Sequence, residues 1–158
     1  MSSSREQSGE DTPDLEGVEQ RAGTGAAVLD ASAVLAWLRD EPGAKTVDTY
    51  LSGDRRTTAN GVVISAVNLS EVHQKLAQHG VDADRTLRQL LALGLQVEPF
   101  GTLDASAAAR LWPLTRSAGL SLGDRACLAL ARRLDLPAVT ADTAWTTLDV
   151  GVTVIPIR

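Results

Sequence analysis

Four acidic residues stand where predicted strands meet predicted helices. Asp30 ends the run AAVLD, and Asp142 ends the run PAVTAD. Glu71 falls in the first turn of the helix after the run GVVISAV, and Asp124 lies at the start of the helix LGDRACLALARRLD. The carboxyl ends of parallel strands meet at one edge of a sheet, so we expect the four side chains to converge there. Carboxylates within a few Å repel one another, and a divalent cation relieves that repulsion. Oxygen ligands without His or Cys favour Mg²⁺ or Mn²⁺ over zinc.

Each of these acids has a simpler explanation as a helix cap. Asp30 and Asp142 can be N-caps, and the segments Asn68-Leu-Ser-Glu71 and Ser121-Leu-Gly-Asp124 both have the spacing of a capping box. Capping explains any one of the acids, whereas it gives no reason for four of them to meet. The two interpretations therefore differ in one respect, since only a cluster of acids requires a cation.

The elements that must position these residues alternate between strand and helix. Apolar and β-branched runs predict strands over 26–30, 61–67, 95–100, 137–142 and 151–157. Apolar residues at helical spacing predict helices over 32–40, 44–51, 68–80, 81–94, 103–118 and 122–135, with a kink or break at Pro113. This alternation favours an α/β fold of three layers, with a central five-stranded parallel sheet covered on both faces. Order along the chain leaves the order of the strands in the sheet open.

Composition narrows the class of protein. The chain has 158 residues, of which 44% are hydrophobic and 22% charged, as expected for one soluble domain. Its single cysteine and two histidines exclude a disulfide framework and a Cys- or His-built zinc site. No apolar run approaches the roughly 18 residues that cross a bilayer. The polar N-terminus is no signal or transit peptide, so we expect a cytoplasmic protein without membrane contact.

Much of the negative charge lies at the N-terminus. Residues 1–25 hold six acids and two arginines, a net charge of −4, and the remaining 14 acids and 13 bases add −1. A segment so poor in apolar residues buries too little surface to offset the entropy of ordering it. We therefore predict a disordered acidic tail over 1–25 and one folded domain over 26–158.

The sequence resembles the PIN-domain ribonucleases, and most closely the VapC-type toxins of toxin–antitoxin pairs. The resemblance spans residues 27–157 and rests on four motifs in the family's order and spacing: VLDASAVLAWL, Asn68-x-x-Glu71, SLGDRACLALA and VTADTAW. It implies a PIN-like fold, a homodimer, inhibition by a small antitoxin, and an endoribonuclease that depends on Mg²⁺ or Mn²⁺. It also implies that the matching acids hold the metal: Asp30, Glu71, Asp124 and Asp142.

The chemistry that follows is hydrolysis of RNA by metal-activated water, which leaves 5′-phosphate and 3′-hydroxyl ends. Histidine bases are then unnecessary, and we expect His73 and His79 to be surface residues. Supporting roles are open to several residues that are equally explained as caps or solvated side chains. These are the metal-site neighbours Asn68, Ser32, Thr140 and Thr143, and the candidate phosphate contacts Arg125, Arg55–Arg56 and Arg132–Arg133.

The helices after the first predicted strand carry more apolar residues than one short helical face needs. We predict that part of this surface receives an antitoxin peptide as a helix in a groove. Ordinary core packing is the equally open alternative. The residues concerned are Val34, Trp37, Leu38, Val47 and Leu51.

Other α/β classes fit the sequence less well. A phosphoacceptor receiver domain requires a lysine after a late strand, but the only lysines are Lys45 and Lys75. A haloacid-dehalogenase-type phosphatase requires Asp-x-Asp after its first strand, where this chain has Asp30-Ala-Ser32. The alternative that remains is a non-catalytic interaction module on the same fold, which has no need of four mutually repelling acids.

Overall fold

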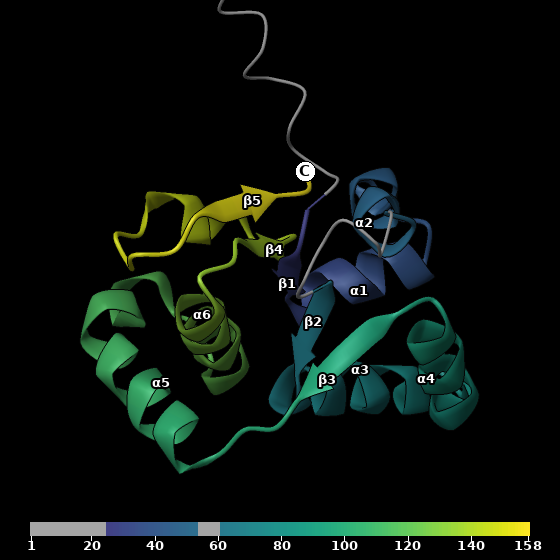
Figure 1. Ribbon diagram of the computed structural model, residues 1–158, viewed down its shortest axis with the longest axis horizontal. Helices are drawn as coiled ribbons and strands as arrows, with labels where there is room; N and C mark the ends of the chain where they lie inside the picture. The colour runs from purple at the N-terminus through teal and green to yellow at the C-terminus, as the bar shows by residue number, and fades with distance from the viewer. Residues whose placement is uncertain (1–24, 54–60) are drawn as a thin grey trace, which may run out of the picture.

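Five parallel strands form the central sheet of this protein (Figure 1). The computed structural model describes residues 25–53 and 61–158. The sheet order is β3-β2-β1-β4-β5, and every neighbouring pair is parallel. The predicted α/β fold with a five-stranded parallel sheet is confirmed. The strands are β1 (Ala27–Leu29), β2 (Val62–Ser65), β3 (Leu95–Glu98), β4 (Ala138–Thr140) and β5 (Val154–Pro156).

Helices cover both faces of the sheet and make the outer two layers (Figure 1). The first group packs on one face: α1 (Ala31–Leu38), α2 (Ala44–Leu51), α3 (Ala66–Gln78) and α4 (Ala83–Ala92). The second group packs on the other: α5 (Thr102–Thr115), the 3₁₀ turn η2 (Arg116–Ala118), α6 (Leu122–Leu134) and the 3₁₀ turn η3 (Thr143–Thr147).

Each central strand contributes to both cores, because successive side chains of a strand point to opposite faces. In β1, Ala27 and Leu29 join the core under α1 to α4, whereas Val28 joins the core under α5 and α6. In β2, Ile64 and Val63 divide in the same way. These strands are apolar on both sides because both of their faces are buried.

The strand order places a crevice at the carboxyl ends of β1 and β4. After β1 the chain builds β2 and β3 on one side, and it then crosses to the other side for β4 and β5. A parallel sheet opens for ligands where its connections diverge in this way. Asp30 follows β1 and Asp142 follows closely after β4, so both begin at this crevice.

Two boundaries differ from the sequence prediction. The helix expected over 68–80 begins at Ala66, with Ser65 as its N-cap, so Glu71 lies in the second turn rather than the first. The helix expected over 103–118 continues past Pro113 to Thr115 and then tightens into η2. The helix therefore ends two residues after the proline.

Three of the five residues predicted to form a docking surface are core residues instead. Val34, Val47 and Leu51 are at most 5% exposed and pack beneath the first group of helices. The prediction is wrong for these three, because α1 and α2 are short helices that both bury their apolar sides against the sheet. Trp37 and Leu38 remain half-buried at the end of α1.

Some predictions fall outside the described residues, namely the tail up to residue 24 and the pair Arg55–Arg56. Within residues 25–53 and 61–158, no helix is both long enough and apolar enough to cross a membrane.

Candidate active site

Asp30 is a buried carboxylate surrounded by hydrogen-bond donors. It is 3% exposed and caps α1 through the backbone N–H of Ser32. Its Oδ2 accepts hydrogen bonds from the hydroxyls of Ser32, at 2.5 Å, and Thr140, at 3.1 Å. Burial raises the pKa of Asp30 to about 6, with Asp124 and Glu71 adding to the rise and the two hydroxyls opposing it. Ser32, one of the neighbours whose supporting role the sequence leaves open, therefore holds this carboxylate.

Asn68 joins three segments from a fully buried position inside α3. Its side-chain Nδ2 donates to Asp30 Oδ1, at 3.2 Å, and to the carbonyl oxygen of Gly123, at 3.0 Å. Both partners are acceptors, so the amide can face them only with its nitrogen. Asn68 Oδ1 is buried and has no hydrogen-bond partner among the described residues. The capping explanation for Asn68 is wrong, because Ser65 caps this helix.

Glu71 lies where α3 packs against α6, beside Gly123. A Cβ atom placed on Gly123 would lie 3.0 Å from Glu71 Oε2 and 3.6 Å from Asn68 Nδ2. Glycine at position 123 therefore leaves room for the end of the Glu71 side chain, which would have to shift slightly to accommodate a Cβ atom there. Burial and the charge of Asp124 raise the pKa of Glu71. Asn68 and Gly123 thus join the segments that carry Asp30, Glu71 and Asp124, and the charges of Glu71 and Asp124 both contribute to the raised pKa of Asp30.

Asp124 is a helix cap as well as a member of this group. Its Oδ2 accepts from the backbone N–H of Ser121 at 2.7 Å, and its own N–H donates to Ser121 Oγ at 3.1 Å. The expected capping box is confirmed. A capping box needs only an acceptor oxygen at position 124. Capping therefore does not explain why Asp30 and Glu71, the residues grouped with Asp124, are also acids.

Asp142 is the one exposed residue among the four acids. Its side chain is exposed and caps η3 by accepting from the N–H of Ala144 at 2.9 Å. A single residue links it to Asp30, since the Asp142 N–H donates to Thr140 Oγ1 at 3.1 Å and that hydroxyl donates to Asp30. Thr140 is therefore a second support of the Asp30 carboxylate, beside Ser32.

Arg125, His73 and Cys127 have structural positions. Arg125 Nη1 donates to the carbonyl oxygen of Ala108 on α5, at 3.0 Å, and Arg125 forms no ion pair with an acid of the described residues. His73 is half-buried, contrary to expectation, whereas His79 is exposed as expected. Cys127 is fully buried in the core.

The family is decided by a match that covers most of the chain. The family model of the PIN domain matches residues 27–150. This chain belongs to the PIN domain family. The PIN domain family consists of nucleases, which supports a nuclease, a hydrolase of nucleic acids, for this chain. No curated protein matches the sequence.

Solved structures with the same fold include several toxins. FitAcB from Neisseria gonorrhoeae is 22% identical, with a TM-score of 0.62 over 83% of this chain and 97% of that one. A toxin–antitoxin complex from Klebsiella pneumoniae is 16% identical, with a TM-score of 0.60 over 84% and 98%. VapC20 from Mycobacterium tuberculosis, a sarcin–ricin loop cleaving toxin, is 15% identical, with a TM-score of 0.58 over 76% and 92%. At these identities the likeness establishes the fold.

PIN domain nucleases generally use a divalent metal, and the donors of this PIN domain suit one. Its acids are hard oxygen ligands, which Mg²⁺ and Mn²⁺ prefer. Asn68 Oδ1 adds a buried oxygen beside them without a hydrogen-bond partner among the described residues. Within the described ranges, no three His, Cys, Asp or Glu side chains are grouped so that they could hold a metal ion as they stand.

Proposed function

We propose that this PIN domain is an endoribonuclease that depends on Mg²⁺ or Mn²⁺ and acts as the toxin of a toxin–antitoxin pair. The observation that carries the proposal is that Asn68 and Gly123 join the segments of Asp30, Glu71 and Asp124: Asn68 donates to Asp30 and to the Gly123 carbonyl, and Glu71 lies beside Gly123. Family membership supports a nuclease. The toxins that share the fold, one of which cleaves the sarcin–ricin loop, support RNA as the substrate. The nuclease domain comprises residues 26–158, acts in the cytoplasm and forms a homodimer.

In this proposal four acids hold the metal, namely Asp30, Glu71, Asp124 and Asp142. The metal supplies Lewis-acid activation of phosphate and of water. The chain supplies position, because Ser32, Thr140 and Asn68 fix the Asp30 carboxylate with three side-chain hydrogen bonds. Asp142 is the one of these acids that is exposed to solvent, so a large substrate can reach it directly. Attack by water rather than by the ribose 2′-hydroxyl leaves 5′-phosphate and 3′-hydroxyl ends.

Cleavage of RNA by the purified chain tests the proposal. We expect Mn²⁺ or Mg²⁺ to support cleavage of total RNA, excess EDTA to abolish it, and the new ends to carry 5′-phosphate. Cyclic phosphate ends, or cleavage that survives chelation, would contradict the mechanism. A chain that neither cleaves RNA nor gains thermal stability with Mn²⁺ would instead be the non-catalytic interaction module.

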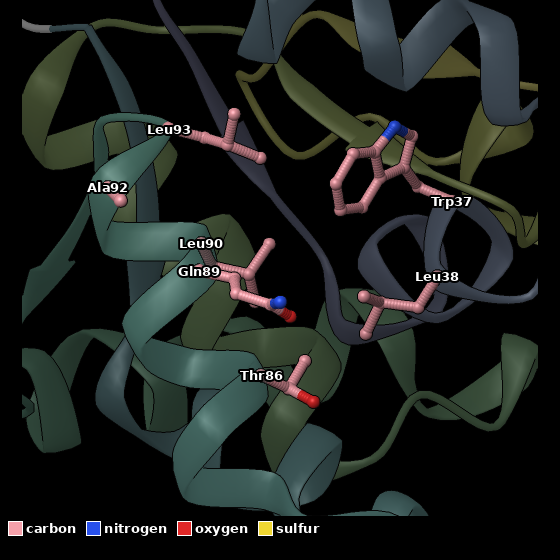
Figure 2. Close-up of a pocket in the computed structure, with 7 residues that line it drawn as sticks. All are labelled: Trp37, Leu38, Thr86, Gln89, Leu90, Ala92 and Leu93. Atoms are coloured by element: carbon pink, nitrogen blue, oxygen red, sulfur yellow. The ribbon is translucent and has the colours of Figure 1, made fainter.

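The proposed antitoxin site is a hollow between the end of α1 and the side of α4. Trp37 and Leu38 form one wall, and α4 forms the other with Leu90 and Leu93, across a volume of about 560 Å³ (Figure 2). Leu93 is 38% exposed, so apolar surface is available here that the core does not use. An amphipathic helix laid into such a hollow buries its apolar face. This is the part of the predicted docking surface that core packing leaves open.

We expect Leu38→Asp to weaken binding of the cognate antitoxin at least tenfold, because the new carboxylate loses its water when a helix covers it. Leu103→Asp is the matched control, since Leu103 is 81% exposed at the start of α5, on the other side of the sheet. Titration calorimetry with the purified antitoxin measures both. Equal affinities for the two variants would place the antitoxin elsewhere.

A further inference from the structure

A second groove lies between α5 and α6, which pack side by side on the face of the sheet opposite α1 to α4 (Figure 1). It encloses about 270 Å³. Its lining consists of Ala107, Arg110 and Leu111 from α5 and Ala129, Arg132 and Arg133 from α6. Because alanine has a short side chain, the two alanines leave a hollow, and three long basic side chains surround it.

The positive charge of this groove is only partly neutralised. Arg133 pairs with Asp104 at 3.0 Å and with Glu98 at 3.3 Å. Arg110 and Arg132 have no hydrogen bond or ion pair with any residue of the described ranges, and no acid lines the groove. Two exposed guanidinium groups therefore share one hollow without a counter-charge among the described residues.

The helix dipole accounts for one of these charges. Arg132 lies in the last turn of α6, where a cation interacts favourably with the helix C-terminus. Arg110 lies well inside α5, so it has no such partner. Arg110 therefore lies near a second cation, Arg132, without a helix terminus to stabilise its charge. A bound anion would relieve the repulsion between the two guanidinium groups.

We infer that the groove between α5 and α6 binds the phosphodiester backbone of single-stranded RNA, through Arg110 and Arg132. Guanidinium groups suit phosphate because they offer paired N–H donors at a fixed angle. Contacts of this kind position a strand without reading its bases. The inference rests on the proposed function, which makes RNA the substrate.

The groove is placed to hold a strand that also reaches the acids. Asp124 and Arg132 belong to the same helix, eight residues apart, which is about 12 Å at the rise of an α-helix. An RNA strand held at the acid group therefore needs only a few nucleotides to reach the groove along α6. The groove contributes affinity for long substrates and takes no part in the chemistry.

Salt-dependent RNA binding by the Arg110→Gln/Arg132→Gln double variant tests this inference. The probe is a 20-nucleotide fluorescein-labelled single strand, measured by anisotropy in EDTA so that no cleavage occurs. We expect the affinity to fall about tenfold, and the slope of log K against log [KCl] to fall by about 1.4, since each lost contact removes about 0.7. Unchanged melting temperature establishes that the variant is folded.

The matched control is Arg85→Gln/Arg88→Gln on α4, which removes the same charge from the other side of the sheet. An equal loss of slope in both double variants would overturn the groove, because only net charge would then matter. So would a loss with duplex DNA but none with RNA. The binding result does not depend on catalysis. If the chain does not cleave RNA but the groove variant alone loses salt-dependent binding, the groove is supported and the nuclease assignment is contradicted. If the chain cleaves RNA but the groove variant binds like wild type, the nuclease assignment is supported and the groove is contradicted.

Kinetics give a second readout in the active protein. The double variant is expected to raise KM for long RNA about tenfold with kcat unchanged, while leaving cleavage of a trinucleotide unaffected. A lower kcat on both substrates would overturn a role confined to binding.

Discussion

Replacing Asp124 with Asn is expected to lower RNA cleavage by at least about two orders of magnitude while leaving the protein folded. The amide keeps an acceptor oxygen for the N–H of Ser121, so the capping box survives. What disappears is one negative charge beside Asp30 and Glu71, and with it one proposed metal ligand. The rise in melting temperature on adding Mn²⁺ is expected to shrink, because that rise reports metal affinity.

The metal-free protein is expected to respond differently from the metal-bound one. Losing the charge relieves repulsion, but a carboxylate in the first turn of a helix is also favoured by about 0.3–1 kcal/mol. These effects partly cancel, so we expect the free energy of unfolding in EDTA to rise by no more than about 1 kcal/mol. A simple loss of a cap does not produce lost activity together with intact stability.

Asp82→Asn is the matched control for this variant. Asp82 caps α4 by accepting from the N–H of Arg85 at 2.9 Å, and it lies exposed, away from the acid group. Asn caps about as well as Asp, so its stability, activity and metal response are expected to stay near wild type. Full activity of Asp124→Asn with an unchanged response to Mn²⁺ would refute the proposed site.

The stability of the metal-free protein is expected to fall by about 3 kcal/mol through Asp30 as the pH rises from about 4 to about 6. The pKa of this carboxyl is about 6 in the folded protein, against 3.8 without the fold. Between these values the folded state holds a proton that the unfolded state has released, so the folded state is favoured most at the lower pH. Above pH 6 both states are ionised, and the folded state carries the full cost of a buried charge.

Urea unfolding in EDTA between pH 4 and pH 7.5 measures this effect as the difference between wild type and Asp30→Asn. The amide does not ionise, and the hydroxyls of Ser32 and Thr140 can turn to accept from it. We expect the stability of the variant relative to wild type to rise across the interval, and Mn²⁺ to reduce the loss in wild type by stabilising the ionised carboxylate. A difference that stays constant with pH would contradict the assigned ionisation of Asp30.

The ends of the strands were readable from the sequence where an apolar run stops at an acid. Asp30 and Asp142 were placed correctly beside their strands for that reason, and the Ser121 capping box was correct because its signal is local. The start of α3 was wrong because Ala66 and Val67 continue the apolar run, and a buried first turn of a helix resembles a strand over so few residues. Ser65, the N-cap of α3, therefore lies inside what the sequence presents as one apolar run.

Contacts between segments were beyond the reach of the sequence. Nothing local shows that Gly123 lets Glu71 approach α6, or that Asn68 reaches both Asp30 and the Gly123 carbonyl. The same holds for Thr140, whose hydroxyl meets Asp30 from a strand 110 positions away in the sequence. The apolar surplus of α1 and α2 was visible, but apolar residues for a core and for a partner have the same pattern.

The wide spacing of the acids has a consequence for protein synthesis. Asp30 emerges early from the ribosome, Glu71 and Asp124 follow at intervals, and the strand that carries Thr140 pairs on both sides only after β5 is made. A nascent chain that has reached Asp124 therefore holds the acids without the sheet edge that aligns them. The proposed ribonuclease would thus acquire activity late, so an incomplete chain would not attack RNA around the ribosome that is making it.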